Sequence, residues 1–172
     1  GYPIFIFFAK IVFFLSNSLG ITFSIMGGIS IFIIIHFTCK LARIELNSLA
    51  GLFCSAIIFF NPLLWLLSNR YMPDIFGAAI MVAALYFLIL HTDFNYKLMI
   101  GAFLTGILAG TRLSYLPVLI VPAALAVYNS ETRIYFLYSF VIGIIVWLLP
   151  FIWVTGWDDL LLAASNQTIG HF

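Results

Sequence analysis

The fold class is decided by Leu19–Cys39, a run that reads LGITFSIMGGISIFIIIHFTC and carries no charged side chain. Its length matches the about 20 apolar residues with which a helix crosses a hydrocarbon core about 30 Å thick. The Gly27–Gly28 pair inside the run leaves room for the backbone of a second helix. We therefore expect a transmembrane helix here, closely packed against a neighbour.

The rest of the 172-residue chain is similarly apolar. Hydrophobic residues make up 65% of it, charged residues only 8%, and the mean hydropathy is +1.20. Soluble domains are about half apolar and about a quarter charged. Because so few polar residues could not cover a water-facing surface, we expect the lipid bilayer to be the solvent of this chain. The net charge of +1 gives no reason to expect a nucleic-acid partner.

The cysteine pattern gives no sign of a metal centre or a redox site. Cys39 and Cys54 belong to no CxxC pair and to no Cys/His cluster, and we interpret them as free thiols packed like small hydrophobic side chains. No metal-binding HExxH, phosphate-cradling glycine loop or nucleophile elbow is present. We therefore predict no metal and no cofactor.

Four further apolar runs predict membrane helices. They are Leu46–Asn69, Ile75–Leu90, Leu98–Ser130 and Ile134–Thr155. Near the end of the first run, Asn61-Pro62 indicates a kink or an early stop, because Asn-Pro commonly opens a turn.

Leu98–Ser130 is too long for one straight helix across a bilayer. Its only charged residue lies in Gly110-Thr111-Arg112, and Pro117 and Pro122 follow. We therefore expect two short helices that meet near this tripeptide. Small residues that recur every four positions predict close helix packing on the first of them; they are Gly101, Thr105 and Ala109.

Taken together, these runs predict an all-α fold: a polytopic transmembrane bundle of about six membrane helices, preceded by a short interfacial helix over residues 1–16. The whole chain, 1–172, is expected to be one transmembrane domain, with residues 156–172 as the start of an extracytoplasmic loop. The sequence begins without an initiator Met and ends as a polar segment starts. We interpret it as an internal piece of a longer multi-pass membrane protein, located in the plasma (inner) membrane if bacterial.

The basic residues predict the orientation of the bundle. Alternating spans put Lys40, Arg43, Lys97 and Arg133 on one face, which the positive-inside rule makes cytoplasmic. The other face then carries Lys10, Arg70, Arg112 and the acidic tail. Because arginines on an outer face oppose that rule, we expect them to have another role.

The polar joint Asn69–Asp74, between two apolar runs, is the first candidate site. Arg70 and Asp74 lie four residues apart in it, so they could form a simple ion pair or cap the end of a span. Alternatively, they could form a polar site at the outer mouth of the bundle, where a guanidinium suits phosphate or carboxylate. We expect the second joint, Gly110–Arg112, to share this site.

Four other residues complete the candidate substrate-binding set. Arg112 could reach up to the outer interface or bind an anionic headgroup, and Lys10 could also reach the headgroups. Gln167 and His171 lie in the polar tail, where a loop histidine is usually only solvated. No catalytic residue can be assigned from the residues alone.

Several segments together resemble the GT-C glycosyltransferases, in particular the protein O-mannosyltransferases and the bacterial lipid A aminoarabinose transferases. These segments are Gly1–Phe5 with Lys10, Asn61-Pro62, Ser68–Arg70 with Asp74, Gly106–Arg112 running to Pro117 and Pro122, and Gln167–Phe172. The resemblance implies transfer of a sugar from a polyprenyl-phosphate carrier to an acceptor at the outer membrane face. It implies that the bilayer and the lipid-linked sugar donor are the partners of the protein.

The family's usual catalytic carboxylate would lie upstream of Gly1, so the resemblance leaves the catalytic residue unknown and the isolated piece inactive. Asp74 could be the base that deprotonates the acceptor, or it could orient Arg70.

Two other functions stay open. The broken run around Gly110 would also fit a transporter or flippase, and the small-residue faces would fit a non-catalytic membrane subunit.

Overall fold

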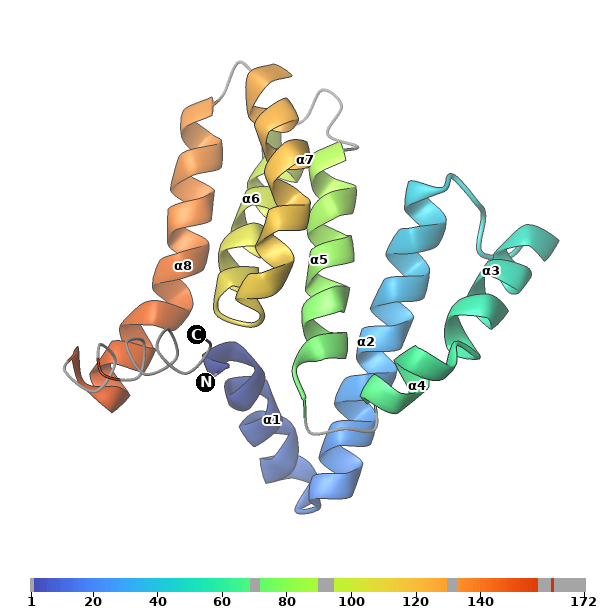
Figure 1. The fold of residues 1–172 in the computed structure, drawn as a ribbon, viewed down its shortest axis with the longest axis horizontal. Helices are drawn as coiled ribbons and strands as arrows, with labels where there is room; N and C mark the ends of the chain where they lie inside the picture. Colours follow the sequence, from blue (N-terminus) through green and yellow to red (C-terminus); the bar gives the residue numbers. More distant parts are fainter. Residues whose placement is uncertain (1, 69–71, 90–94, 130–132, 158–161, 163–172) are drawn as a thin grey trace, which may run out of the picture.

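The computed structural model describes residues 2–68, 72–89, 95–129, 133–157 and 162. These residues form helices and turns without a strand, which confirms the all-α prediction (Figure 1). The elements are α1 (Pro3–Ser16), α2 (Leu19–Leu41), α3 (Leu49–Phe59), α4 (Pro62–Ser68), α5 (Asp74–Ile89), α6 (Asn95–Ala109), the 3-10 turn η1 (Leu113–Tyr115), α7 (Leu116–Asn129) and α8 (Arg133–Thr155).

Two helices of the described chain, α2 and α8, are long and apolar enough to cross a membrane. Each contains 23 residues, about 35 Å of helix at the usual rise per residue. The predicted helix at Leu19–Cys39 is thus confirmed. Gly28 differs from the expectation of close packing, because a Cβ added there would meet no atom of the described residues within 4 Å.

The predicted span Leu46–Asn69 is wrong as a single helix. It divides into α3, of 11 residues, and α4, of 7 residues. The side-chain Oδ1 of Asn61 accepts hydrogen bonds from the amides of Leu63 at 2.9 Å and Leu64 at 3.4 Å. Asn61 therefore caps α4, and Pro62 occupies the first helical position, where its missing N–H costs nothing.

The long run Leu98–Ser130 divides as predicted. Helix α6 ends at Ala109, and the amides of Thr111 and Arg112 bond back to the carbonyl of Leu108 at 3.0 and 2.8 Å. The turn then leads through η1 into α7. Pro122 lies inside α7 without ending it.

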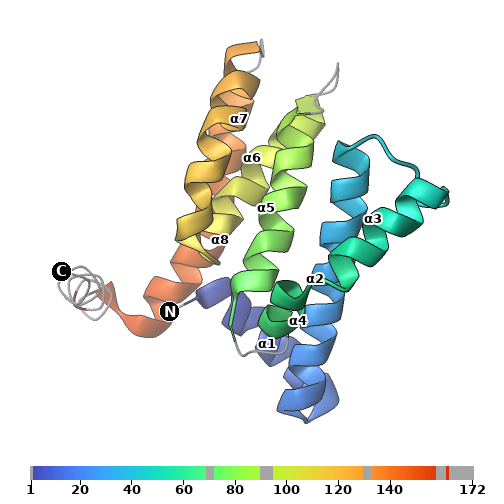
Figure 2. The same cartoon turned by 45° about the vertical axis from the view of Figure 1, so that its right-hand side comes forward.

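The helices form two groups that meet along α2 and α5 (Figures 1 and 2). In one group, α5 to α8 enclose a core whose fully buried members are Ala84, Leu88, Leu98, Leu108, Leu119 and Ala126. In the other, α1, α3 and α4 lie against α2, and residues of α2 and α5 form a second core of Ile31, Ile34, Ile75 and Ala79.

Helices α6 and α8 have the most extensive contact in the molecule. A Cβ added to Gly106 would overlap the carbonyl of Phe140 and lie 3.0 Å from the Cα of Gly143. The indole N–H of Trp147 donates to the carbonyl of Gly106 at 3.1 Å. Close packing against α8 therefore depends on Gly106 and Gly143, whereas the predicted Gly101 packs against α5 through Leu88.

Large apolar side chains cover much of the outer surface. Phe14 of α1 is 81% exposed and Trp153 of α8 is 89% exposed, and every α-helix carries at least one such residue. Cys39 is buried and Cys54 half-buried, and both are free thiols. A surface of this kind needs an apolar covering.

Candidate functional site

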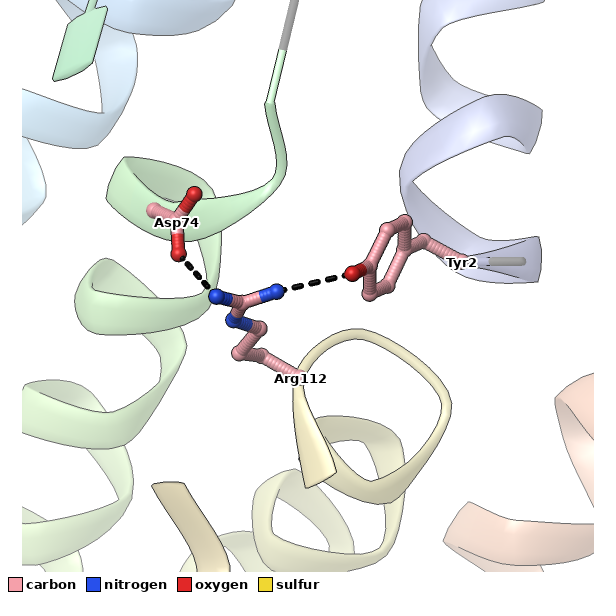
Figure 3. Close-up of polar contacts among 3 residues, drawn as sticks. All are labelled: Tyr2, Asp74 and Arg112. Carbon is pink, nitrogen blue, oxygen red and sulfur yellow. Dashed lines mark hydrogen bonds and ion pairs between the residues drawn. The ribbon is translucent and has the colours of Figure 1, made fainter. Parts of the chain in front are cut away.

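Three polar side chains from distant parts of the chain meet at one end of the bundle (Figure 3). Nη2 of Arg112 lies 2.7 Å from Oδ1 of Asp74, and Nη1 of Arg112 donates to the hydroxyl of Tyr2 at 2.8 Å. Tyr2 directly precedes α1, Asp74 begins α5, and Arg112 lies in the turn between α6 and α7. We call these three residues the Arg112 cluster.

Asp74 is positioned by the start of α5. Pro73 precedes it, and the carbonyl of Pro73 accepts from the amide of Gly77 at 2.7 Å, which closes the first turn. The free N–H groups of a helix start carry partial positive charge, so a carboxylate is favoured there. Asp74 is only 8% exposed. Its negative charge is stabilised by Arg112 and by the helix start together.

Arg112 is fixed by an extended backbone, with φ −154° and ψ 91°, at the residue that precedes η1. Its side chain is 31% exposed. Its Nε is buried and has no hydrogen-bond partner within the described part of the chain. Arg112 Cζ also lies 5.6 Å from the centre of the Tyr2 ring, close enough for a cation–π interaction. The guanidinium is therefore firmly held, yet part of it stays accessible.

Gly77 allows the turn to lie against α5. A Cβ added there would lie 2.9 Å from the Cβ of Arg112 and 3.2 Å from the ring of Tyr115. Any larger residue would push Arg112 away from Asp74. Gly77 thus helps to form the site by leaving room for Arg112, although it has no side-chain group of its own.

The structure brings together Asp74 and Arg112, two of the predicted site residues, so the two predicted joints share one site. Lys10 is exposed on α1, eight residues beyond Tyr2 and thus about 12 Å of helical rise away. It has no hydrogen bond or ion pair with the three described residues of the cluster. Arg70, Gln167 and His171 lie outside the described residues, and their roles stay predictions.

Two members of the site were missed by the sequence reasoning. Tyr2 lies 110 positions from Arg112, and Gly77 gave no chemical signal. Tyr2 was noted only as part of the segment Gly1–Phe5, and its place directly before Pro3 fits a helix start. Asp74 pairs with Arg112, and its expected pairing with Arg70 stays a prediction because Arg70 lies outside the described residues.

The chemistry of the cluster is that of an anion site with an internal carboxylate. A guanidinium offers five N–H donors, and Asp74 and Tyr2 take one bond each from different nitrogens. The second N–H groups of Nη1 and Nη2 suit phosphate or carboxylate oxygens, whereas the Nε–H is buried. No group of three or more His, Cys, Asp or Glu able to hold a metal occurs in the described parts of the chain.

Comparisons of the chain with protein-family models, with curated proteins and with solved structures found no match. The Arg112 cluster, with the apolar surface around it, is the feature of the molecule that best indicates a function.

Proposed function

We propose that this chain is part of a multi-pass membrane protein with about six membrane helices and an interfacial α1. The proposal is supported by the two long apolar helices, the shorter apolar helices beside them and the exposed large side chains. In a bilayer these side chains would contact lipid rather than water. Helices α6 and α7 are short as individual spans, and their joint then lies at one membrane boundary.

The arrangement of the helix ends supports a proposed orientation of the bundle in the membrane. The end of α2 and the starts of α6 and α8 lie at the upper side of Figure 1, and these helix ends carry Lys40, Lys97 and Arg133. The start of α5 and the joint between α6 and α7, which carry Asp74 and Arg112, lie at the lower side. If the side rich in basic residues is cytoplasmic, the Arg112 cluster faces outward.

For the chemistry, we propose transfer of a sugar from a polyprenyl-phosphate carrier to an acceptor at the outer membrane face. The sugar and its carrier come from the family resemblance, and one observation supports the binding of a phosphate: a partly exposed arginine is held by Asp74 and Tyr2 at the proposed membrane boundary. Ionisable groups at membrane depth are costly and are commonly retained for function. Arg112 would bind the carrier phosphate, and the apolar helix faces would lie along the prenyl chain.

In this mechanism Asp74 orients Arg112. Its Oδ1 is engaged by the guanidinium at 2.7 Å, so this oxygen holds Arg112 in place rather than facing an acceptor. The base that deprotonates the acceptor would be the carboxylate that the family resemblance puts upstream of Gly1. Arg70, Lys10, Gln167 and His171 remain proposed contributors to substrate binding.

The test is sugar transfer by the full-length protein carrying Arg112→Ala. We expect transfer to fall by about 100-fold or more, since removing one charge-stabilising donor typically costs that much. Arg133→Ala, at the other end of α7, is the matched control and should transfer normally. Full activity of Arg112→Ala in protein that folds and inserts normally would contradict the assignment.

A transporter or flippase is the second candidate, and the break between α6 and α7 favours it. Discontinuous membrane helices often surround substrate sites in transporters. Movement of a lipid-linked sugar across proteoliposomes without any transfer to an acceptor would support this function over the first. If alanine at both Asp74 and Arg112 left transfer and transport unchanged, a non-catalytic subunit would be favoured.

A further inference from the structure

Tyr2 has a hydrogen-bonding capacity that its contact with Arg112 does not use. A phenol can accept one hydrogen bond and donate another. In the structure the hydroxyl of Tyr2 accepts from Nη1 of Arg112 at 2.8 Å. The O–H proton of Tyr2 is therefore free to point toward a ligand that approaches the same nitrogen.

We propose that Tyr2 is a ligand-binding residue whose hydroxyl donates to the phosphate that Arg112 binds. This inference rests on the proposed function and adds a residue to its site. The ligand class is a prenyl monophosphate ester, and Tyr2 would contact the phosphate rather than the prenyl chain.

The charges of the cluster explain why a neutral donor is useful there. Asp74 balances the charge of Arg112, so an approaching phosphate meets a carboxylate as well as a guanidinium. Asp74 also occupies a donor on Nη2. A phenol hydroxyl adds a donor without adding charge, and hydrogen bonds to a charged oxygen are stronger than those between neutral groups.

The start of α1 is anchored, which fixes Tyr2 in this position. The amide of Ile4 bonds to the carbonyl of Gly110 at 3.5 Å, next to the turn that carries Arg112. Ile4 and Phe5 are buried, and the ring of Phe5 lies 6.0 Å from that of Phe76 on α5. Tyr2 is therefore held by contacts to both of the elements that supply the other two residues of the cluster.

The test is the affinity of full-length protein in nanodiscs for farnesyl phosphate and for farnesol, its neutral counterpart. Tyr2→Phe removes the hydroxyl and keeps the ring over Arg112. We expect the Kd for farnesyl phosphate to rise about tenfold, the usual effect of one lost hydrogen bond to a charged group. The Kd for farnesol should stay unchanged. Tyr138→Phe, the same change on the exposed face of α8, is the control and should bind both probes as the wild type does.

The outcomes separate this inference from the proposed function. If Arg112→Gln loses farnesyl phosphate and Tyr2→Phe keeps wild-type affinity, the role of Tyr2 is overturned and the function stands. If Tyr2→Phe weakens farnesyl phosphate and farnesol equally, the hydroxyl acts on the fold rather than on phosphate, which also overturns the role. Wild-type affinity in both variants, or no binding by the wild type, would contradict the proposed function as well.

Discussion

Two arginines lie at opposite ends of α7, and they are held very differently. Arg112, before α7, pairs with Asp74 at 2.7 Å and bonds to Tyr2. Arg133, after α7, is exposed at the edge of an apolar hollow of about 450 Å³, and its Nη2 lies 3.5 Å from the carbonyl of Tyr128. Arg112 is part of a network of side chains from three segments of the chain, while Arg133 contacts a backbone carbonyl at the end of α7. We infer that Arg112 serves a site and that Arg133 does not.

The largest difference in stability is expected between the variant that lacks Arg112 and the variant that lacks Arg133. Arg112→Ala leaves Asp74, which is 8% exposed, without its cation. The free energy of unfolding should fall by about 2 kcal/mol. Arg133→Ala should change it by no more than about 0.5 kcal/mol, as usual for exposed positions. Denaturation in detergent measures both, and equal losses would break the distinction between the two ends.

The next largest loss of stability is expected at Gly77, which leaves room for Arg112 beside α5. In Gly77→Ala the new Cβ would lie 2.9 Å from the Cβ of Arg112, so the turn must shift. We expect a loss of about 1 to 2 kcal/mol of stability and a several-fold weaker affinity for farnesyl phosphate.

Gly28→Ala is the control for this change, because its added Cβ would meet nothing within 4 Å. It should be neutral or slightly stabilising, since Ala favours a helix over Gly. If Gly77→Ala behaved in the same way, the close approach of the turn to α5 would not matter to the site.

The smallest effect is expected at Lys10. It shares the proposed outer side with Arg112 but is exposed on α1, outside the cluster. Lys10→Gln should weaken farnesyl phosphate binding only about twofold at low salt, and the effect should vanish near 1 M salt, where exposed charges are screened. A loss as large as that of Arg112→Gln would mean that Lys10 belongs to the site itself.

Local signals predicted much of the fold. Pro73 before Asp74 marked the start of a helix, and Gly110 with Arg112 marked the break in a run too long for one span. The break at Asn61-Pro62 was noticed, but it was interpreted as a kink or early stop in one span. Because Asn61 caps a new helix there, the run becomes two helices.

The site was predictable only in part, because it depends on tertiary contacts. Asp74 and Arg112 were both singled out from the sequence, as charges between apolar runs. Their pairing depends on how α5 packs beside the α6–α7 turn, whereas sequence distance alone pointed to Arg70 as the partner of Asp74. Tyr2 and Gly77 carry no charge, so their roles became visible only once α1 and α5 were in place.

The most direct test of the account compares the affinities of Arg112→Gln and Arg133→Gln for farnesyl phosphate, measured side by side in nanodiscs. The account predicts a loss of about 100-fold for Arg112→Gln and a change of less than about twofold for Arg133→Gln. Similar affinities for the two variants, whether both weakened or both unchanged, would contradict the claim that the Arg112 cluster is a phosphate site.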